Sequence, residues 1–290
     1  MTNVALENLK LSHWMASTSS MDVLTLGELI LPGAHNSGVD KKATYAAPGV
    51  AHWVACQNNS FYDQLRNGAR ALDVRVEYDV DPRGVGTFWF QHNGVKSSRS
   101  LENLVMQLIR FLEENPDEFV LVDFHELKSG NTAFDPQEFN RFLLTHLGPR
   151  IIPYNNRYLS LGQLKEVSGV QRVWLAAQQH PALHQAWFQP KIAHHWSGIG
   201  DTSINELEAH IDSVMQRPPT GSNPWSLSAT SYSLALGPIN IKEQLNQWFD
   251  PNTGHWVLNC SVINADFFED SRLVRNCRTA NLIKARLRPE

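Results

Sequence analysis

The chain has 290 residues, of which 42% are hydrophobic and 19% are charged, and its formal net charge is −4. This composition is typical of a soluble globular protein. It argues against a protein that wraps nucleic acid, because such binding needs a basic face. No stretch approaches the roughly 20 apolar residues that a membrane-spanning helix needs. The first twenty residues also lack the basic region and apolar core of a signal peptide.

Short apolar runs predict strands along the chain, within residues 28–35, 69–78, 86–93, 118–127, 170–178, 190–197 and 255–267. Helical periodicity predicts helices over residues 100–116, 134–148, 202–217 and 240–249. Ser100 and Asp135 are the expected N-caps of the first two helices, and Gly148 is the expected stop of the second. Residues 217–226 are rich in Pro, Gly and Ser and are expected to form a loop.

The alternation of strands and helices predicts a parallel sheet that is covered by helices. Seven or eight such units in fewer than 300 residues favour one α/β barrel, with a single site at the carboxyl ends of its strands. We therefore predict a single domain that covers residues 1–290.

Two predicted strands carry polar residues inside otherwise apolar runs. Asp73 and Arg75 alternate with apolar residues, so both point to the same face of their strand, and Asp123 and His125 do the same on theirs. Charged side chains inside a small barrel are costly unless they are paired. We therefore predict that these two strands line a polar site.

Two histidines stand near the ends of predicted strands, His35 after the first and His92 at the end of the third. Together with Asp73 and Arg75 they form a set that suits cleavage of a phosphodiester. One imidazole can remove a proton from the attacking hydroxyl and the other can protonate the leaving oxygen, while the guanidinium holds the phosphate between them.

The three cysteines, Cys56, Cys260 and Cys277, lie far apart in the sequence and show no metal-binding spacing. We expect buried or incidental thiols. A single Cys260–Cys277 disulfide is the alternative.

Four segments, LPGAHNS, NGARALDVRV, QHNG and FLEENPDEFVLVDF, occur in this order within the first 128 residues. They resemble the X-domain of the phosphatidylinositol-specific phospholipases C, above all the metal-independent bacterial enzymes and the eukaryotic single-domain relatives. Residues 246–268 are similar to the last helix and strand of that family, whereas residues 130–235 match weakly. The resemblance implies a distorted (β/α)8 TIM-type barrel.

The resemblance also implies a reaction and the residues that carry it. In this family the inositol 2-hydroxyl attacks the phosphorus and releases diacylglycerol and a cyclic inositol phosphate. By position, His35 corresponds to the general base and His92 to the general acid. Asp266 matches the acid that orients the base histidine.

Arg75 stands where metal-dependent relatives carry a carboxylate that binds Ca²⁺. The resemblance therefore implies that the guanidinium takes the place of the ion, held by Asp73, so that the site needs no metal and no other cofactor. Asn36 stands where the metal-free enzymes have an aspartate, and we expect its amide to orient His92. An asparagine at this place is a Ca²⁺ ligand in the metal-dependent branch, so Ca²⁺ is an alternative that Arg75 disfavours.

Headgroup contacts are less clear than the catalytic set. His125, Glu126 and Lys128 on one strand, and Trp196 after another, are the candidates for substrate binding.

The implied partner is a phospholipid substrate at a membrane interface, and we expect a monomer that binds no nucleic acid. An extracellular or membrane-peripheral location is favoured over the cytoplasm. Trp53, Trp196 and Trp225 are candidates for membrane contact. The basic residues between positions 272 and 288 form either the solvated face of a last helix or a contact with anionic lipid.

Two other functions are compatible with parts of the pattern. A glycerophosphodiester or sphingomyelin phosphodiesterase on a related barrel would use a metal and an acidic pair, which the Asp73–Arg75 pair does not provide. A catalytically silent module that binds lipid or inositol phosphate would have no need of both histidines.

Overall fold

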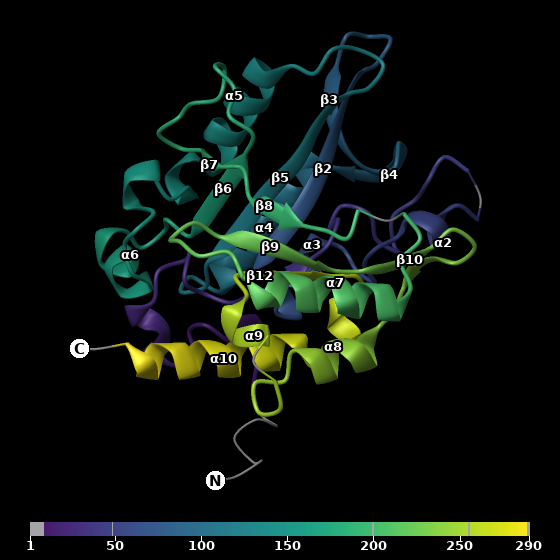
Figure 1. Cartoon of the computed structure of the whole chain (residues 1–290). Helices are drawn as coiled ribbons and strands as arrows, with labels where there is room; N and C mark the ends of the chain where they lie inside the picture. The colour runs from purple at the N-terminus through teal and green to yellow at the C-terminus, as the bar shows by residue number, and fades with distance from the viewer. Residues whose placement is uncertain (1–8, 48, 199, 255, 289–290) are drawn as a thin grey trace.

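The computed structural model describes residues 9–47, 49–198, 200–254 and 256–288. Eight strands form a curled sheet in which each strand runs parallel to its neighbours (Figure 1). In spatial order they are β7 Gln189–Pro190, β6 Val173–Ala177, β5 Val120–Ser129, β2 Ala71–Val80, β1 Leu31–Ala34, β12 Val262–Ala265, β9 Trp225–Ala229 and β8 Ala193–His195.

The barrel is open along one seam. β7 and β8 stand at the two ends of the strand order, and within the described residues no strand pairing joins them. They are nevertheless neighbours in sequence, because only Lys191 and Ile192 separate them. The prediction of a distorted α/β barrel is therefore confirmed, and the distortion lies at this seam.

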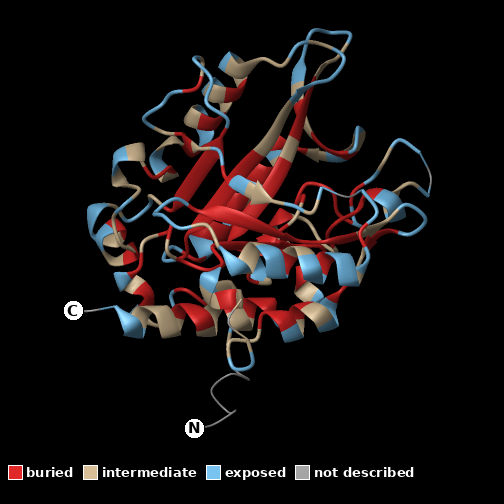
Figure 2. Cartoon of the chain, viewed as in Figure 1, coloured by how far each residue is buried: buried red, intermediate tan, exposed pale blue. Residues whose placement is uncertain are grey.

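Helices lie around the sheet, and most residues of its central strands are buried, whereas β8 contains no buried residue (Figure 2). They are α2 Ala51–Val54, α3 Phe61–Arg66, α4 Leu101–Glu114, α5 Pro136–Leu147, α6 Leu161–Val167, α7 Ile204–Gln216, α8 Lys242–Trp248, α9 Trp256–Asn259 and α10 Leu273–Leu287. Short 3-10 helices occupy Leu11–His13, Ser19–Val23, Gly148–Arg150, Tyr154–Asn156 and Phe268–Asp270.

The four predicted helices are confirmed as α4, α5, α7 and α8. Ser100 caps α4 through a reciprocal pair of bonds with Asn103, and Asp135 accepts hydrogen bonds from two backbone amides at the start of α5. Gly148 ends α5 as expected. Local capping signals therefore determine where these helices begin and end.

One predicted barrel strand has a different place in the sheet. Residues 86–93 were expected to join the parallel sheet, but β3 Gly86–His92 pairs antiparallel with β2 and then with β4 Val95–Ser100. Asn93 and Gly94 make the turn between β3 and β4, and both have positive φ angles. An Asn-Gly turn of this kind favours a tight hairpin, so the chain returns at once without a crossover helix.

Three other expectations were wrong in part. The run 255–267 is not one strand, because its described residues begin with α9 and only then enter β12. Residues 190–197 contain the end of β7 and all of β8, and the expected loop at 217–226 already contains the start of β9. A small hairpin, β10 Ser231–Ser233 and β11 Gly237–Ile239, was not predicted.

All three cysteines are buried and free. The expectation of buried thiols is confirmed, and the alternative Cys260–Cys277 disulfide is wrong.

Candidate active site

A cavity of about 630 Å³ lies over the carboxyl ends of the barrel strands. Its lining includes most of the residues singled out from the sequence: His35, Arg75, His92, His125, Glu126, Lys128, Trp196 and Asp266. Asp73 and Asn36 are buried beside it. The structure thus brings residues from positions 35 to 266 into one place.

His35 follows β1, a strand that lies between β12 and β2. Its Nδ1 lies 2.7 Å from Oδ1 of Asp266, and its Nε2 lies 2.9 Å from Nη2 of Arg75. A carboxylate only accepts hydrogen bonds and a guanidinium only donates them. His35 therefore carries its proton on Nδ1 and has its lone pair on Nε2, where it accepts from Arg75; this is the tautomer that a general base needs.

Asp73 is buried beneath this pair. Its Oδ2 accepts a hydrogen bond from the backbone amide of Asn36 at 3.3 Å and lies 3.8 Å from Nη2 of Arg75. Burial alone would raise the pKa of Asp73, but the nearby Arg75 and histidine side chains lower it well below its usual range. The carboxylate stays ionised and can fix Arg75 electrostatically.

His92 faces His35 across the cavity, with ring centroids 6.1 Å apart and planes nearly perpendicular. Nδ1 of His92 donates a hydrogen bond of 2.9 Å to the carbonyl oxygen of Val54. This fixes the neutral ring with its lone pair on Nε2. Burial, followed by the charges of His35 and Arg75, lowers the pKa of His92 to about 4.

The expected role of Asn36 is wrong. Both polar atoms of its buried side chain lack a hydrogen-bond partner among the described residues, so the amide does not orient His92. The carbonyl of Val54 does so instead. Val54 is the last residue of α2, and carbonyls in the last turn of a helix have no partner within the helix.

Asp123 and His194 form a pair that the sequence reasoning only partly anticipated. Nε2 of His194 lies 2.6 Å from Oδ2 of Asp123, and its ring stacks on His125 at a centroid distance of 3.8 Å. His125 is the extra residue at an irregularity in the β2–β5 pairing, where Arg75 aligns with Glu126. Burial lowers the pKa of His125 to about 4 and raises that of Asp123.

The other predicted headgroup residues have different surroundings. Oε2 of Glu126 accepts a hydrogen bond of 2.6 Å from Gln91, which also lines the cavity and was not predicted. Lys128 is exposed at the rim, as is Trp196 with 56% of its surface accessible. Glu126 is therefore engaged within the protein, whereas Lys128 and Trp196 stand toward solvent.

The β10–β11 hairpin and α2 form an apolar part of the rim. Leu234 and Leu236 are 71% and 66% exposed, and Trp53 is 41% exposed with its indole nitrogen donating to the carbonyl of Ala235. Trp225, the third expected membrane contact, is buried. That expectation is wrong because Trp225 opens β9 and its side chain packs in the core.

The basic residues at the C-terminus lie on and after α10. Arg278 contacts Ser17, and Lys284 and Arg288 contact Glu28. These contacts favour a structural role over lipid binding for this run. Among the described residues, no helix is both long enough and apolar enough to cross a membrane.

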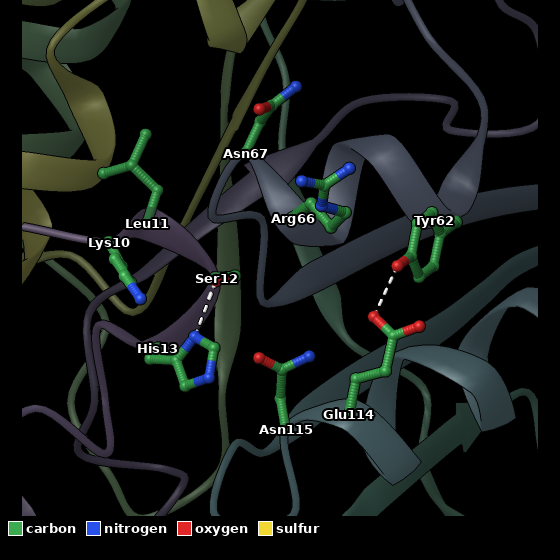
Figure 3. Close-up of a pocket in the computed structure, with 9 residues that line it drawn as sticks. All are labelled: Lys10, Leu11, Ser12, His13, Tyr62, Arg66, Asn67, Glu114 and Asn115. Atoms are coloured by element: carbon green, nitrogen blue, oxygen red, sulfur yellow. Dashed lines mark hydrogen bonds between the residues drawn. The ribbon is translucent and has the colours of Figure 1, made fainter.

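A second cavity, of about 670 Å³, lies between the N-terminal segment and the helices α3 and α4 (Figure 3). Tyr62 donates a hydrogen bond to Glu114 at one side of it, and Ser12 bonds to His13 at the other. None of the predicted site residues lines this cavity.

No family model matches the chain. The chain is 24% identical over 163 residues to a protein of Danio rerio named PI-PLC X domain-containing protein 1, a match that covers 48% of this chain and 52% of the relative. It is also 24% identical over 129 residues to a 1-phosphatidylinositol phosphodiesterase of Listeria monocytogenes, covering 42% of this chain and 35% of the relative. The matches thus span about half and about a third of these relatives.

Solved structures of other proteins superpose on nearly the whole of this chain. The phosphatidylinositol-specific phospholipase C of Listeria monocytogenes superposes with a TM-score of 0.71 at 16% identity, covering 94% of this chain and 99% of that one. A variant of the Staphylococcus aureus enzyme gives a TM-score of 0.70 at 13% identity and covers 94% and 98%. The chain therefore has the fold of these enzymes, and its resemblance to the phosphatidylinositol-specific phospholipase C X-domain family is confirmed.

Proposed function

We propose that this chain cleaves phosphatidylinositol by attack of the inositol 2-hydroxyl on phosphorus. One observation carries the proposal: His35, held between Asp266 and Arg75, faces His92 across one cavity. Two imidazoles on opposite sides of a cavity can serve the attacking and the leaving oxygen of a single displacement.

In the proposed reaction, Arg75 moves its hydrogen bond from His35 to a non-bridging phosphate oxygen. Nε2 of His35 then takes the proton of the 2-hydroxyl as the new O–P bond forms. The bond from phosphorus to the glycerol oxygen breaks, and Nε2 of His92, protonated in the substrate complex, gives its proton to that oxygen. The products are diacylglycerol and inositol 1,2-cyclic phosphate. Each proton transfer runs between a histidine and a substrate oxygen, and the Arg75 guanidinium supplies the positive charge beside the phosphate, so the proposed reaction uses no metal.

The apolar rim supports a lipid surface as the place of action. Leu234, Leu236 and Trp53 are exposed beside the cavity, and exposed leucine and tryptophan side chains favour the interface of a bilayer. Action as a monomer, outside the cell or peripheral to a membrane, is part of the proposal.

The test is ³¹P NMR of the products from phosphatidylinositol micelles in the presence of EDTA. A cyclic phosphodiester signal is expected from the wild type. His35→Ala and His92→Ala should each lower the rate by about 10²- to 10⁴-fold, because each removes one proton-transfer group. His13→Ala, which changes an exposed histidine of the second cavity, is the control and should keep full activity.

Other products would point to other functions. Near-normal turnover in either active-site variant would refute the assigned roles, and strict dependence on Ca²⁺ would show that a metal takes part. Free phosphorylated headgroup without a cyclic stage would indicate the related metal-dependent phosphodiesterases. Binding without turnover under either condition would indicate a silent lipid-binding module.

A further inference from the structure

Four metal-ligating side chains converge beside the cavity, and two of them, His125 and His194, line it. Asp73 on β2, Asp123 and His125 on β5, and His194 on β8 place one ligand atom each so that all four lie within 4.8 Å of one another. Both carboxylates are at least 97% buried. The acid–base steps proposed above use Asp73 to hold Arg75, and they leave the other three without a role.

Three atoms of this cluster lack the partners that buried polar atoms normally have. Oδ1 of Asp73, Oδ1 of Asp123 and Nδ1 of His125 have no hydrogen-bond partner among the described residues. Buried polar atoms are nearly always satisfied, and a group of unsatisfied ones in a single place calls for a ligand. Because the three atoms include two carboxylate oxygens and an imidazole nitrogen, that ligand should be a cation.

The donor set selects the kind of cation. Two oxygens and two nitrogens suit a tetrahedral ion of Zn²⁺ type, whereas Ca²⁺ takes six to eight oxygens. Bonds of about 2.0–2.1 Å place tetrahedral ligands about 3.3 Å apart. The Asp123–His194 pair, now at 2.6 Å, would have to open by less than about 1 Å.

We propose that Asp73, Asp123, His125 and His194 bind one Zn²⁺ ion. A second cluster, formed by His35, Cys56 and Asp266, fits less well. Both ring nitrogens of His35 are already bonded, to Asp266 and to Arg75.

The site shares Asp73 with the proposed catalytic set, which gives Zn²⁺ a second effect. A metal on Asp73 would compete with Arg75 for that carboxylate and place a divalent charge beside the guanidinium. Zn²⁺ should therefore inhibit the reaction. This inhibitory part rests on the proposed function, whereas metal binding itself does not.

The experiment uses the full chain without an affinity tag, freed of metal by chelator. Co²⁺ is added as a spectroscopic substitute for Zn²⁺, and Zn²⁺ affinity is measured by calorimetry. We expect one equivalent of Co²⁺ with the absorption of a tetrahedral ion. Affinity for Zn²⁺ should fall at least about tenfold in Asp123→Asn, His125→Ala and His194→Ala. His195→Ala, which changes the neighbouring histidine outside the cluster, should bind like the wild type.

Other results would overturn the proposed metal site. No metal binding by the folded wild type, or unchanged affinity in His194→Ala, would overturn the proposal. A thiolate-to-cobalt charge-transfer band that disappears in Cys56→Ser would place the ion at the other cluster and would also overturn it. Circular dichroism identifies any variant that does not fold. Because the three variants lie on two different strands, those that fold still report the affinity for Zn²⁺. Loss of catalytic activity in the metal-free chain would count against the proposed function. It would not count against the metal site, because the cobalt spectra report binding independently of turnover.

Discussion

The two central histidines have the same tautomer, with the proton on Nδ1, but different hydrogen-bond partners. Asp266 and Arg75 fix His35 as a neutral base whose lone pair is already oriented. The carbonyl of Val54 also fixes His92 as neutral, so it must gain a proton on Nε2 before it can act as an acid. A phosphodiester anion bound beside His92 favours that proton by its charge. The substrate therefore helps to prepare its own acid.

This arrangement predicts how the rate depends on pH. In the free protein the pKa of His92 is about 4, so the fraction with the acid proton decreases as the pH rises above that value. In the substrate complex the phosphate raises this pKa. The alkaline limb of kcat/KM, which reports the free protein, should therefore lie at lower pH than the limb of kcat. Full profiles of both constants with a soluble inositol phosphodiester test this, and coincident limbs would contradict it.

At the scale of the element, the pairing of β1 with β12 determines the distance between the base His35 and the carboxylate of Asp266. It pairs with β12 over four residues, so Ala34 lies opposite Ala265, and the next residues along the two strands are His35 and Asp266. Gly33 allows this close approach. A Cβ at Gly33 would overlap Oδ1 of Asn264 and would lie 2.8 Å from Cγ1 of Val262.

Gly33→Ala should therefore separate β1 from β12. We expect a loss of about 1–3 kcal/mol in the free energy of unfolding, as for other overpacked cores. We also expect a loss of about 10- to 100-fold in kcat, because His35 moves relative to Asp266. Urea denaturation and steady-state kinetics measure the two effects. Gly148→Ala is the control, since its Cβ would meet nothing within 4 Å, and a comparable loss there would remove the explanation.

The helices and strands differ in how well the sequence predicts them. The helices α4 and α5 were predictable because their caps are local, and β2 and β5 because polar residues interrupt apolar runs at a period of two. The direction of β3 depends on a turn, and the helix α9 begins inside an apolar run that fits a helix as well as a strand. The Asp123–His194 pair was out of reach, because β5 and β8 are far apart in the strand order and only the curl of the sheet brings them together.

For the whole molecule, the buried histidines connect the site to stability. The pKa of a histidine in an unfolded chain is near 6.5, whereas folded His92 and His125 titrate near 4. The unfolded state thus binds more protons between these values, and stability should decrease as the pH falls from 7 toward 4. The raised pKa of Asp123 acts in the opposite direction, because the folded carboxyl keeps its proton to higher pH.

His125→Leu should isolate one part of this effect. The variant cannot take up the proton that the unfolded chain binds at position 125, so its urea midpoint should fall less between pH 7 and pH 5 than that of the wild type. His146→Leu, a change on the exposed surface of α5, provides the comparison. An equal decrease in all three proteins would show that the buried ring at position 125 does not contribute.

The seam between β7 and β8 has a consequence for how the barrel can deform. A barrel whose strands are hydrogen-bonded all the way round resists widening everywhere. Here no described hydrogen-bond ladder joins β7 to β8, and only the backbone of Lys191 and Ile192 connects them. The barrel can therefore widen at this seam. The seam borders the cavity, because Lys191 is one of the residues that line it. His35 and Asp266 follow β1 and β12, in the middle of the strand order, where ladders run on both sides. The fold thus combines a stiff half, which holds the reacting groups, with a compliant half, which can adjust to the size of what enters.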